Sequence, residues 1–221
     1  MNFRETKDAY IIENLPFFCG VTLGFTRPSL DGLNIKDDIK KVFNKEPSLS
    51  FAYLRQMHSS IVHDIKQQGR YNGDGLITDR KKLILVIKTA DCLPLFIIDK
   101  KNLKVGIFHI GWQGAKKGIL DNINFDFTSS YVVIGVGLRK CCYQVGEEFL
   151  KIKMFSPFIA KRKNTLYFDI VSFVRNTLLE KRVASDNFFD VDICSFCSKY
   201  NFFSWRRNKT IKRTLSFITI R

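Results

Sequence analysis

The stretch that decides the fold is TADCLPLFIIDKKNLKVGIFHIGW, residues 89–112. It contains two runs of β-branched and aromatic residues, at 95–99 and 104–110, with Lys-Lys-Asn between them. Such runs predict two antiparallel strands joined by a tight turn. If Lys100 and Lys101 form the turn, Cys92 lies opposite His109. Facing side chains on one side of a sheet have Cβ atoms about 4.5–5.5 Å apart, so both could reach one ion.

Pro94 bears on the register of this hairpin. Proline cannot donate a hydrogen bond to a strand ladder, so we expect an edge or a bulge at this position. A slip of the pairing by two residues keeps Cys92 and His109 on one face, whereas a slip by one residue separates them.

Cysteine and histidine together indicate a metal site. The chain has only three histidines, and His58, Cys92 and His109 are predicted to be metal ligands and catalytic residues. Three protein ligands with an open fourth position are typical of catalytic zinc. The alternative interpretation is a buried thiol with two core histidines. His63 is the weaker candidate, because a helical spacing of five residues from His58 would place it on another face.

Length and composition indicate one domain, residues 1–221, without repeats or linkers. The N-terminal segment MNFRETKDAYIIENL carries charges throughout and no apolar region before a cleavage site. The most apolar stretch is interrupted by Lys88 and Asp91. We therefore expect a cytoplasmic protein that does not interact with a membrane.

The six cysteines are read as thiols or metal ligands, because no secretion signal accompanies them. Cys194 and Cys197 form a C-x-x-C pair, and Cys141 and Cys142 are adjacent. Together they suggest a second, structural zinc. However, neighbouring residues of an extended segment point to opposite faces, so this second site is not expected.

The formal net charge of +15 favours phosphate-bearing partners. The lysines are scattered, and no recognised DNA- or RNA-binding motif accompanies them. We therefore expect an anionic ligand. A basic nucleic-acid-binding module, which would bind oligonucleotides with salt-sensitive affinity, stays an alternative. The glycines of GWQGAKKG, residues 111–118, could present backbone N–H groups to an anion at a helix start, or could simply allow close packing. Helices are predicted at 36–46 and 169–182.

An ordered series of motifs carries a family resemblance. The motifs are GFTR (24–27), QMHSSIV (56–62), DGLIT (74–78), TADCLPLFIID (89–99), HIGWQG (109–114), IGVGLRKCCYQVG (134–146) and CSFCSKYNFFSWRR (194–207). In this order, the chain resembles the YfiH-type family, known as the polyphenol oxidoreductase laccase domain and associated with purine nucleoside phosphorylase and deaminase activity. The resemblance implies an α/β (α+β) fold, with mixed β-sheets flanked by helices, of the YfiH and cytotoxic necrotizing factor (CNF1-like) type.

The resemblance also implies the site and its chemistry. Zinc would be bound by the histidine of Q-x-H, the cysteine of A-D-C and the histidine of H-x-G-W, which are His58, Cys92 and His109. The substrates would be adenosine, inosine, guanosine and methylthioadenosine, cleaved by phosphate, with adenosine also deaminated. Arg27 of the GFTR motif is expected near the nucleoside.

Departures from the family pattern concern the substrate more than the metal. Gln113 stands where the family has an arginine, so phosphorolysis would either be weaker here or be supported by Lys116, Lys117 or Arg206. The pair Arg206 and Arg207 follows aromatic residues and could bind phosphate or carboxylate through bidentate donors, or form a solvated turn. We predict Arg27, Gln113 and Arg206 as substrate-binding residues.

Asp91 is predicted as a general acid or base because it precedes Cys92. A carboxylate that hydrogen-bonds a turn is the equally favoured interpretation. The leading hypothesis is therefore a zinc-dependent purine nucleoside phosphorylase with adenosine deaminase activity, whose oligomeric state stays open.

Two other enzyme classes compete with this hypothesis. In a hydrolase or transamidase, Cys92 would be the nucleophile and His109 its base. A copper-dependent polyphenol oxidoreductase is the other alternative. A four-copper oxidase needs more imidazoles than three, but a mononuclear site with two histidines and a cysteine is the right ligand set for copper.

Overall fold

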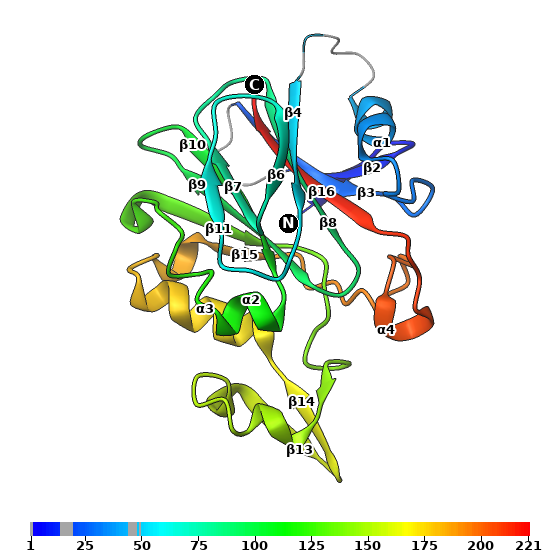
Figure 1. Cartoon of the computed structure of the whole chain (residues 1–221), viewed down its shortest axis with the longest axis vertical. Coiled ribbons are helices and arrows are strands. Elements are labelled where there is room, and N and C mark those ends of the chain that lie inside the picture. Colours follow the sequence, from blue (N-terminus) through cyan, green and yellow to red (C-terminus); the bar gives the residue numbers. More distant parts are fainter. Residues whose placement is uncertain (1, 14–19, 44–47, 49) are drawn as a thin grey trace.

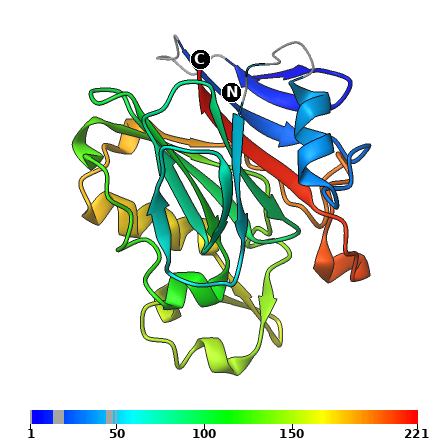
Figure 2. The same ribbon diagram turned by 45° about the horizontal axis from the view of Figure 1, so that its top comes forward.

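Two stacked β-sheets form the centre of the computed structural model, which describes residues 2–13, 20–43, 48 and 50–221 (Figure 1). The larger sheet has seven strands in the order β1-β2-β3-β16-β8-β4-β6. Its strands are β1 (Asn2–Glu5), β2 (Ala9–Glu13), β3 (Val21–Thr26), β16 (Thr214–Ile220), β8 (Leu83–Thr89), β4 (Ser50–Arg55) and β6 (Gly69–Asn72). Figure 2 shows β16, in red, beside the blue N-terminal strands, so the two ends of the chain share this sheet.

The second sheet has six strands in the order β15-β11-β9-β10-β7-β5. Its strands are β15 (Phe188–Asp190), β11 (Ser130–Ile134), β9 (Leu93–Asp99), β10 (Lys104–Ile110), β7 (Gly75–Thr78) and β5 (Val62–Asp64). A small third sheet joins β12 (Gln144–Val145), β14 (Thr165–Phe168) and β13 (Ile159–Arg162). Parallel and antiparallel pairs occur in both large sheets.

Alternating side chains of β9 explain why this strand is apolar throughout. Leu95 and Ile97 belong to a core shared with helices, whereas Phe96 and Ile98 belong to the core between the two large sheets. Side chains of successive strand residues point to opposite faces, so a strand buried on both faces must be apolar at every position. The continuous hydrophobic run of the sequence therefore marks a central strand.

Helices cover the outer faces of the two sheets (Figure 1). Helix α1 (Ile35–Val42) packs Ile35 and Ile39 against the seven-stranded sheet. Helices α2 (Trp112–Lys116) and α3 (Ile170–Glu180) share a core with the six-stranded sheet. Helix α4 (Trp205–Asn208) follows the aromatic segment near the C-terminus. Short 3-10 turns occur at Phe127–Ser129, Glu147–Phe149, Ser156–Phe158 and Ser185–Asn187.

The α/β architecture with mixed sheets flanked by helices confirms the expected fold class. Helix α3 begins where Asp169 accepts a hydrogen bond from the Ser172 backbone N–H, one residue later than the sequence indicates. The helix predicted at 36–46 ends at Val42, and residues 44–46 lie outside the described part of the chain. Among the described residues, no helix combines the length and apolarity needed to cross a bilayer.

Pro94 lies in a central strand, and the expectation of an edge strand is wrong. Its carbonyl accepts the N–H of Gly135 across to the end of β11. The return bond to the Gly135 carbonyl needs an N–H that proline lacks. The guanidinium of Arg139 donates to that carbonyl instead, over 2.6 Å. A buried arginine thus satisfies the carbonyl that the proline leaves without its ladder partner.

Candidate metal centre

Three side chains meet at one edge of the two stacked sheets. His58 follows β4, Cys92 lies in the turn between β8 and β9, and His109 is the penultimate residue of β10. Strands β4 and β8 run parallel, and β9 and β10 run antiparallel. The end of β4, the turn after β8 and the end of β10 therefore lie at the same edge.

The ligand atoms of His58, Cys92 and His109 all lie within 4.8 Å of one another. The Nε2 atom of His58 is 3.7 Å from the Sγ atom of Cys92, and the two imidazole rings have centroids 4.9 Å apart. His109 is 4% exposed, whereas His58 and Cys92 are half-buried. The cluster is therefore closed on the His109 side and open toward solvent on the other.

The strand register differs from the expectation by two residues. His109 pairs with Pro94 rather than with Cys92, which precedes the strand. The loop comprises residues 100–103, since the carboxylate of Asp99 accepts the backbone N–H groups of Lys101 and Asn102. Because the shift is by an even number of residues, it leaves Cys92 on the side of the sheet that His109 faces.

Asp74 holds both histidines in place. Its carboxylate is fully buried and accepts a hydrogen bond of 2.8 Å from Nδ1 of His109. It also accepts the backbone N–H groups of Met57, His58 and Ser59, and the Ser59 hydroxyl. Burial raises the pKa of this carboxyl, but the hydrogen bonds from His109 and Ser59 outweigh it and hold the pKa well below its usual range.

The contact with Asp74 also fixes which nitrogen of His109 is available. Because Nδ1 donates to the carboxylate, Nε2 is the nitrogen that can offer a lone pair to a metal once its proton leaves. Sequence reasoning assigned no role to Asp74, although DGLIT is one of the quoted motifs. The only signal in the sequence was an acidic residue directly before a buried strand, β7.

Electrostatics couple Cys92 to His109. Burial raises the pKa of Cys92, but the neighbouring His109 and His58 lower it to about 6. Burial lowers the pKa of His109, but Cys92 and Asp74 raise it to about 9. Without a cation, the pair is therefore a thiolate beside an imidazolium at neutral pH. A divalent cation would replace the proton on His109 as the partner of that thiolate.

The backbone beside the cluster leaves no room for a side chain at Gly111. A Cβ on Gly111 would lie 2.8 Å from Cδ2 of His58 and 3.1 Å from Sγ of Cys92. His58 itself has a left-handed backbone with φ of 53°. The ammonium of Lys117 donates to the His58 carbonyl over 2.9 Å, which supports this conformation and brings a positive charge to the cluster.

Asp91, next to Cys92, is held by hydrogen bonds. Its Oδ1 accepts the Ser195 hydroxyl over 2.8 Å, and its Oδ2 accepts the backbone N–H of Arg206 over 2.6 Å. The guanidinium of Arg206 donates to the Gln144 carbonyl and lies 5.5 Å from the centre of the Tyr143 ring. Asp91 therefore joins the turn that carries Cys92 to α4 and to the segment that contains Ser195.

The other predicted site residues lie at different places. Gln113 is exposed on α2, one turn before the lysine that contacts His58. Arg27 lies in a surface hollow of about 740 Å³, where its guanidinium contacts Glu5 and the Thr6 carbonyl. None of the three cluster residues is among the residues that line this hollow. His63 hydrogen-bonds the Asn72 carbonyl from β5 and does not join the cluster.

Comparison with known proteins places the chain in a family. The matching family is described as multi-copper polyphenol oxidoreductase laccase, and it matches residues 33–221. The chain is 30% identical over 216 residues to a Clostridium acetobutylicum protein named purine nucleoside phosphorylase, covering 89% of this chain and 86% of that protein. It is 28% identical over 207 residues to a Borreliella burgdorferi protein of the same name, covering 78% and 89%.

Solved structures show the same fold. YlmD from Geobacillus stearothermophilus superposes with a TM-score of 0.86 at 22% identity, covering 99% of this chain and 98% of that one. A Bacillus licheniformis hypothetical protein, YfiH, gives a TM-score of 0.84 at 23% identity, covering 99% of both chains. Since the family match spans most of its length, the chain belongs to the multi-copper polyphenol oxidoreductase laccase family.

Proposed function

We propose that this chain is a zinc-dependent purine nucleoside phosphorylase that cleaves adenosine, inosine, guanosine and methylthioadenosine with phosphate. The observation that carries the proposal is the convergence of His58, Cys92 and His109 within 4.8 Å. The relatives named purine nucleoside phosphorylase support the reaction class. In this reaction the bond between the base and the sugar breaks, and a bond from phosphate oxygen to the sugar forms.

The donor set fits zinc. One thiolate and two imidazoles are good ligands for a borderline-soft ion, and the half-buried side of the cluster leaves a position for substrate. The buried Asp74 supplies the carboxylate that commonly lies behind a metal-binding histidine. When bound, the ion would supply a Lewis acid that stabilises charge developing on the substrate.

The chain itself would bind and orient the anionic reactant. Lys117 places an ammonium group next to His58, and Lys116 and Gln113 are exposed on the same short helix. These groups are the proposed phosphate-binding donors at this edge. Arg206 and Arg27 are proposed to contact the nucleoside, as the family resemblance implies.

Adenosine deamination is proposed as a second activity of the same site. Water replaces the exocyclic amine of adenosine, which requires a group that moves protons near the ring. Asp91 is the proposed acid or base, because it adjoins Cys92. Its two present hydrogen bonds from Ser195 and the Arg206 backbone would also allow a purely structural role.

A Cys-His hydrolase or transamidase is the second candidate function. The lowered pKa of Cys92 and the raised pKa of His109 favour it, because a thiolate beside an imidazolium is the activated form of a cysteine nucleophile. Chelation separates the two candidates. A nucleophile should keep its activity after the metal is removed, whereas a metal enzyme should lose it and recover it with zinc.

The deciding experiment incubates zinc-loaded protein with adenosine, inosine and methylthioadenosine, with and without phosphate, and identifies the products. Free base with ribose 1-phosphate, or with methylthioribose 1-phosphate from methylthioadenosine, formed only with phosphate, supports phosphorolysis. Inosine from adenosine supports deamination. Cys92→Ala should abolish both. The proposal fails if no base is released. Copper-loaded protein that oxidises phenols faster than it cleaves inosine would support the copper alternative.

A further inference from the structure

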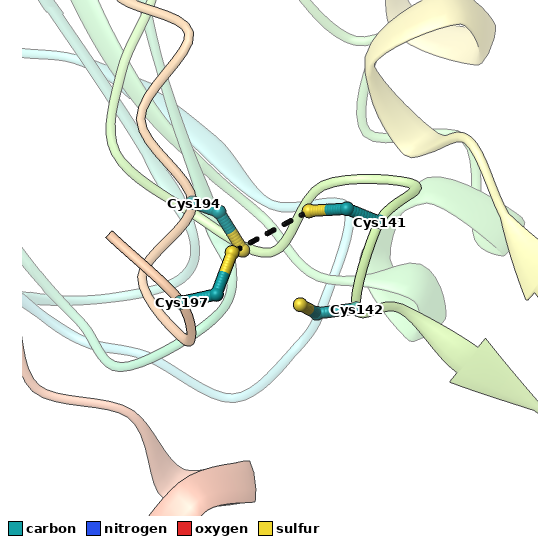
Figure 3. Close-up of side chains that lie close together, drawn as sticks. All are labelled: Cys141, Cys142, Cys194 and Cys197. Atoms are coloured by element: carbon teal, nitrogen blue, oxygen red, sulfur yellow. Dashed lines mark hydrogen bonds between the residues drawn. The ribbon is translucent and has the colours of Figure 1, made fainter. Parts of the chain in front are cut away.

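A second group of sulfur atoms lies outside the metal cluster described above. The Sγ atoms of Cys141, Cys142, Cys194 and Cys197 all lie within 4.8 Å of one another. Figure 3 shows these four side chains, from two separate loops, pointing toward one another. Two of these atoms, those of Cys141 and Cys197, are 3.8 Å apart. Four sulfurs at 2.3 Å from one tetrahedral zinc would be separated by about 3.8 Å.

The expectation that adjacent cysteines point to opposite faces is wrong for this segment. Residues 140–142 form a turn, in which the backbone N–H groups of Cys142 and Tyr143 both donate to the Arg139 carbonyl. In a turn, neighbouring side chains are not forced apart as they are in a strand. The C-x-x-C pair lies in a second turn, closed by the hydrogen bond from the Ser198 N–H to the Cys194 carbonyl.

Protein contacts hold the two loops together without help from the sulfur atoms. Gly137 and Cys194 form a parallel β-bridge, and the Ser195 N–H donates to the Gly137 carbonyl over 3.0 Å. The buried Arg139 pairs with Asp190 at 2.8 Å, which fixes the start of the first turn against the segment that leads to the second. The four thiols are therefore brought together by the fold, and the site would be preformed.

A positively charged side chain contacts the backbone of the C-x-x-C turn. The guanidinium of Arg207 donates to the carbonyls of Phe196 and Ser195, inside the C-x-x-C turn. Cys194 is buried, whereas Cys141 and Cys197 are exposed, so an ion could enter from solvent. Soft thiolate ligands without imidazole or carboxylate favour zinc over magnesium or calcium.

We propose that Cys141, Cys142, Cys194 and Cys197 bind one zinc ion in a structural site with four thiolate ligands. This inference does not depend on the proposed phosphorylase activity. The site would lock two loops that contact Asp91, since Ser195 donates to its carboxylate and the Leu138 N–H donates to its carbonyl. A structural ion at this position would thereby fix the turn that presents Cys92.

Metal analysis of the purified, reduced chain tests the site. We expect two zinc ions per chain, and one in each of Cys141→Ser, Cys197→Ser and Cys92→Ser. Cobalt substitution distinguishes the two sites, because sulfur-to-cobalt absorption rises with the number of thiolates. Cys141→Ser should lose most of this absorption, whereas Cys92→Ser should keep most of it. Lys140→Ser, which changes the exposed neighbour of Cys141 but removes no thiolate, should retain both ions.

Three results would overturn the site. The first is a single zinc in the unaltered chain with these four thiols free to react. The second is a disulfide among them in protein purified with reductant. The third is a cobalt spectrum that Cys141→Ser leaves unchanged. If a serine variant fails to fold, the cobalt absorption of the unaltered chain, compared with that of Cys92→Ser, decides between four thiolates and none. Loss of phosphorylase activity alone neither supports nor contradicts the four-cysteine zinc site.

Discussion

Asp74 and His109 are joined by a 2.8 Å contact between Oδ1 and Nδ1, and both side chains are withdrawn from solvent. Asp74 directly precedes β7 and His109 lies in the neighbouring antiparallel strand β10, and a second bond links the His109 N–H to the Asp74 carbonyl. The same carboxylate accepts the N–H of His58. One buried acid therefore sets the position of two of the three proposed ligands, including the tautomer of one.

Asp74→Asn should weaken zinc binding by about 10–100-fold. The asparagine amide carries N–H groups, which cannot accept the hydrogen bonds that the Asp74 carboxylate now accepts. The free energy of unfolding should fall by about 2 kcal/mol for the lost charge-assisted hydrogen bonds. Competition with a chromogenic chelator measures the affinity, and urea unfolding of the metal-free protein measures the stability. Asp79→Asn is the matched control, since Asp79 is exposed and pairs only with Lys66 among the described ion pairs. Equal zinc affinity in both variants would contradict the role given to Asp74.

Gly111→Ala should reduce zinc affinity at least about tenfold while costing about 1 kcal/mol in the metal-free protein, the loss expected when alanine replaces a better helix N-cap. The added methyl would lie 2.8 Å from the His58 ring, so the ring must move out of the cluster. The backbone conformation accepts alanine, because φ of Gly111 is −87°, but alanine is a poorer helix N-cap than glycine. Thermal unfolding with and without zinc separates the two effects. Gln113→Ala, two residues further on, should bind zinc normally; a similar loss there would remove the steric explanation.

The central hairpin and the proximity of Cys92 and His109 can be predicted from the sequence. Side chains alternate between the two faces of a strand, so a shift of the pairing by two residues keeps both side chains on one face. The sequence does not reveal the register itself, which depends on the loop that Asp99 caps. The role of Asp74 was also out of reach. It arises only when β7 pairs with β10 and the segment after β4 folds over its carboxylate. The sequence suggests the group of four cysteines but argues against it for a similar reason, since the turn at 140–142 is held by Arg139 and its partner Asp190, about fifty residues away.

Alkylation of Cys92 in the metal-free protein should follow an apparent pKa of about 6, where an ordinary thiol titrates near 8.5. The pKa of Cys92 is lowered because the imidazolium of His109 stabilises the thiolate. The reactive thiolate should therefore persist as the pH falls, down to about pH 6. His109→Gln should move the midpoint upward by about one pH unit or more. Peptide mapping with iodoacetamide across pH 5–9 measures it. Zinc should protect the residue, and unchanged alkylation with zinc bound would show that Cys92 is not a ligand.

Gln113→Arg should lower the KM for phosphate by about three- to tenfold, with little change in kcat. Gln113 is exposed on α2, one turn before Lys117, whose ammonium contacts the His58 carbonyl, so an arginine there would add a permanent cation beside the proposed phosphate position. A partly exposed charge contributes about 1 kcal/mol. An interaction made equally in the bound and reacting states changes KM rather than kcat. The decrease in KM should become smaller at an ionic strength near 1 M, where charges more than about 3 Å apart are largely screened from each other. Gln113→Met is the uncharged control of similar length. Equal KM values in the two variants, or a gain that salt does not reduce, would place the phosphate elsewhere than beside α2.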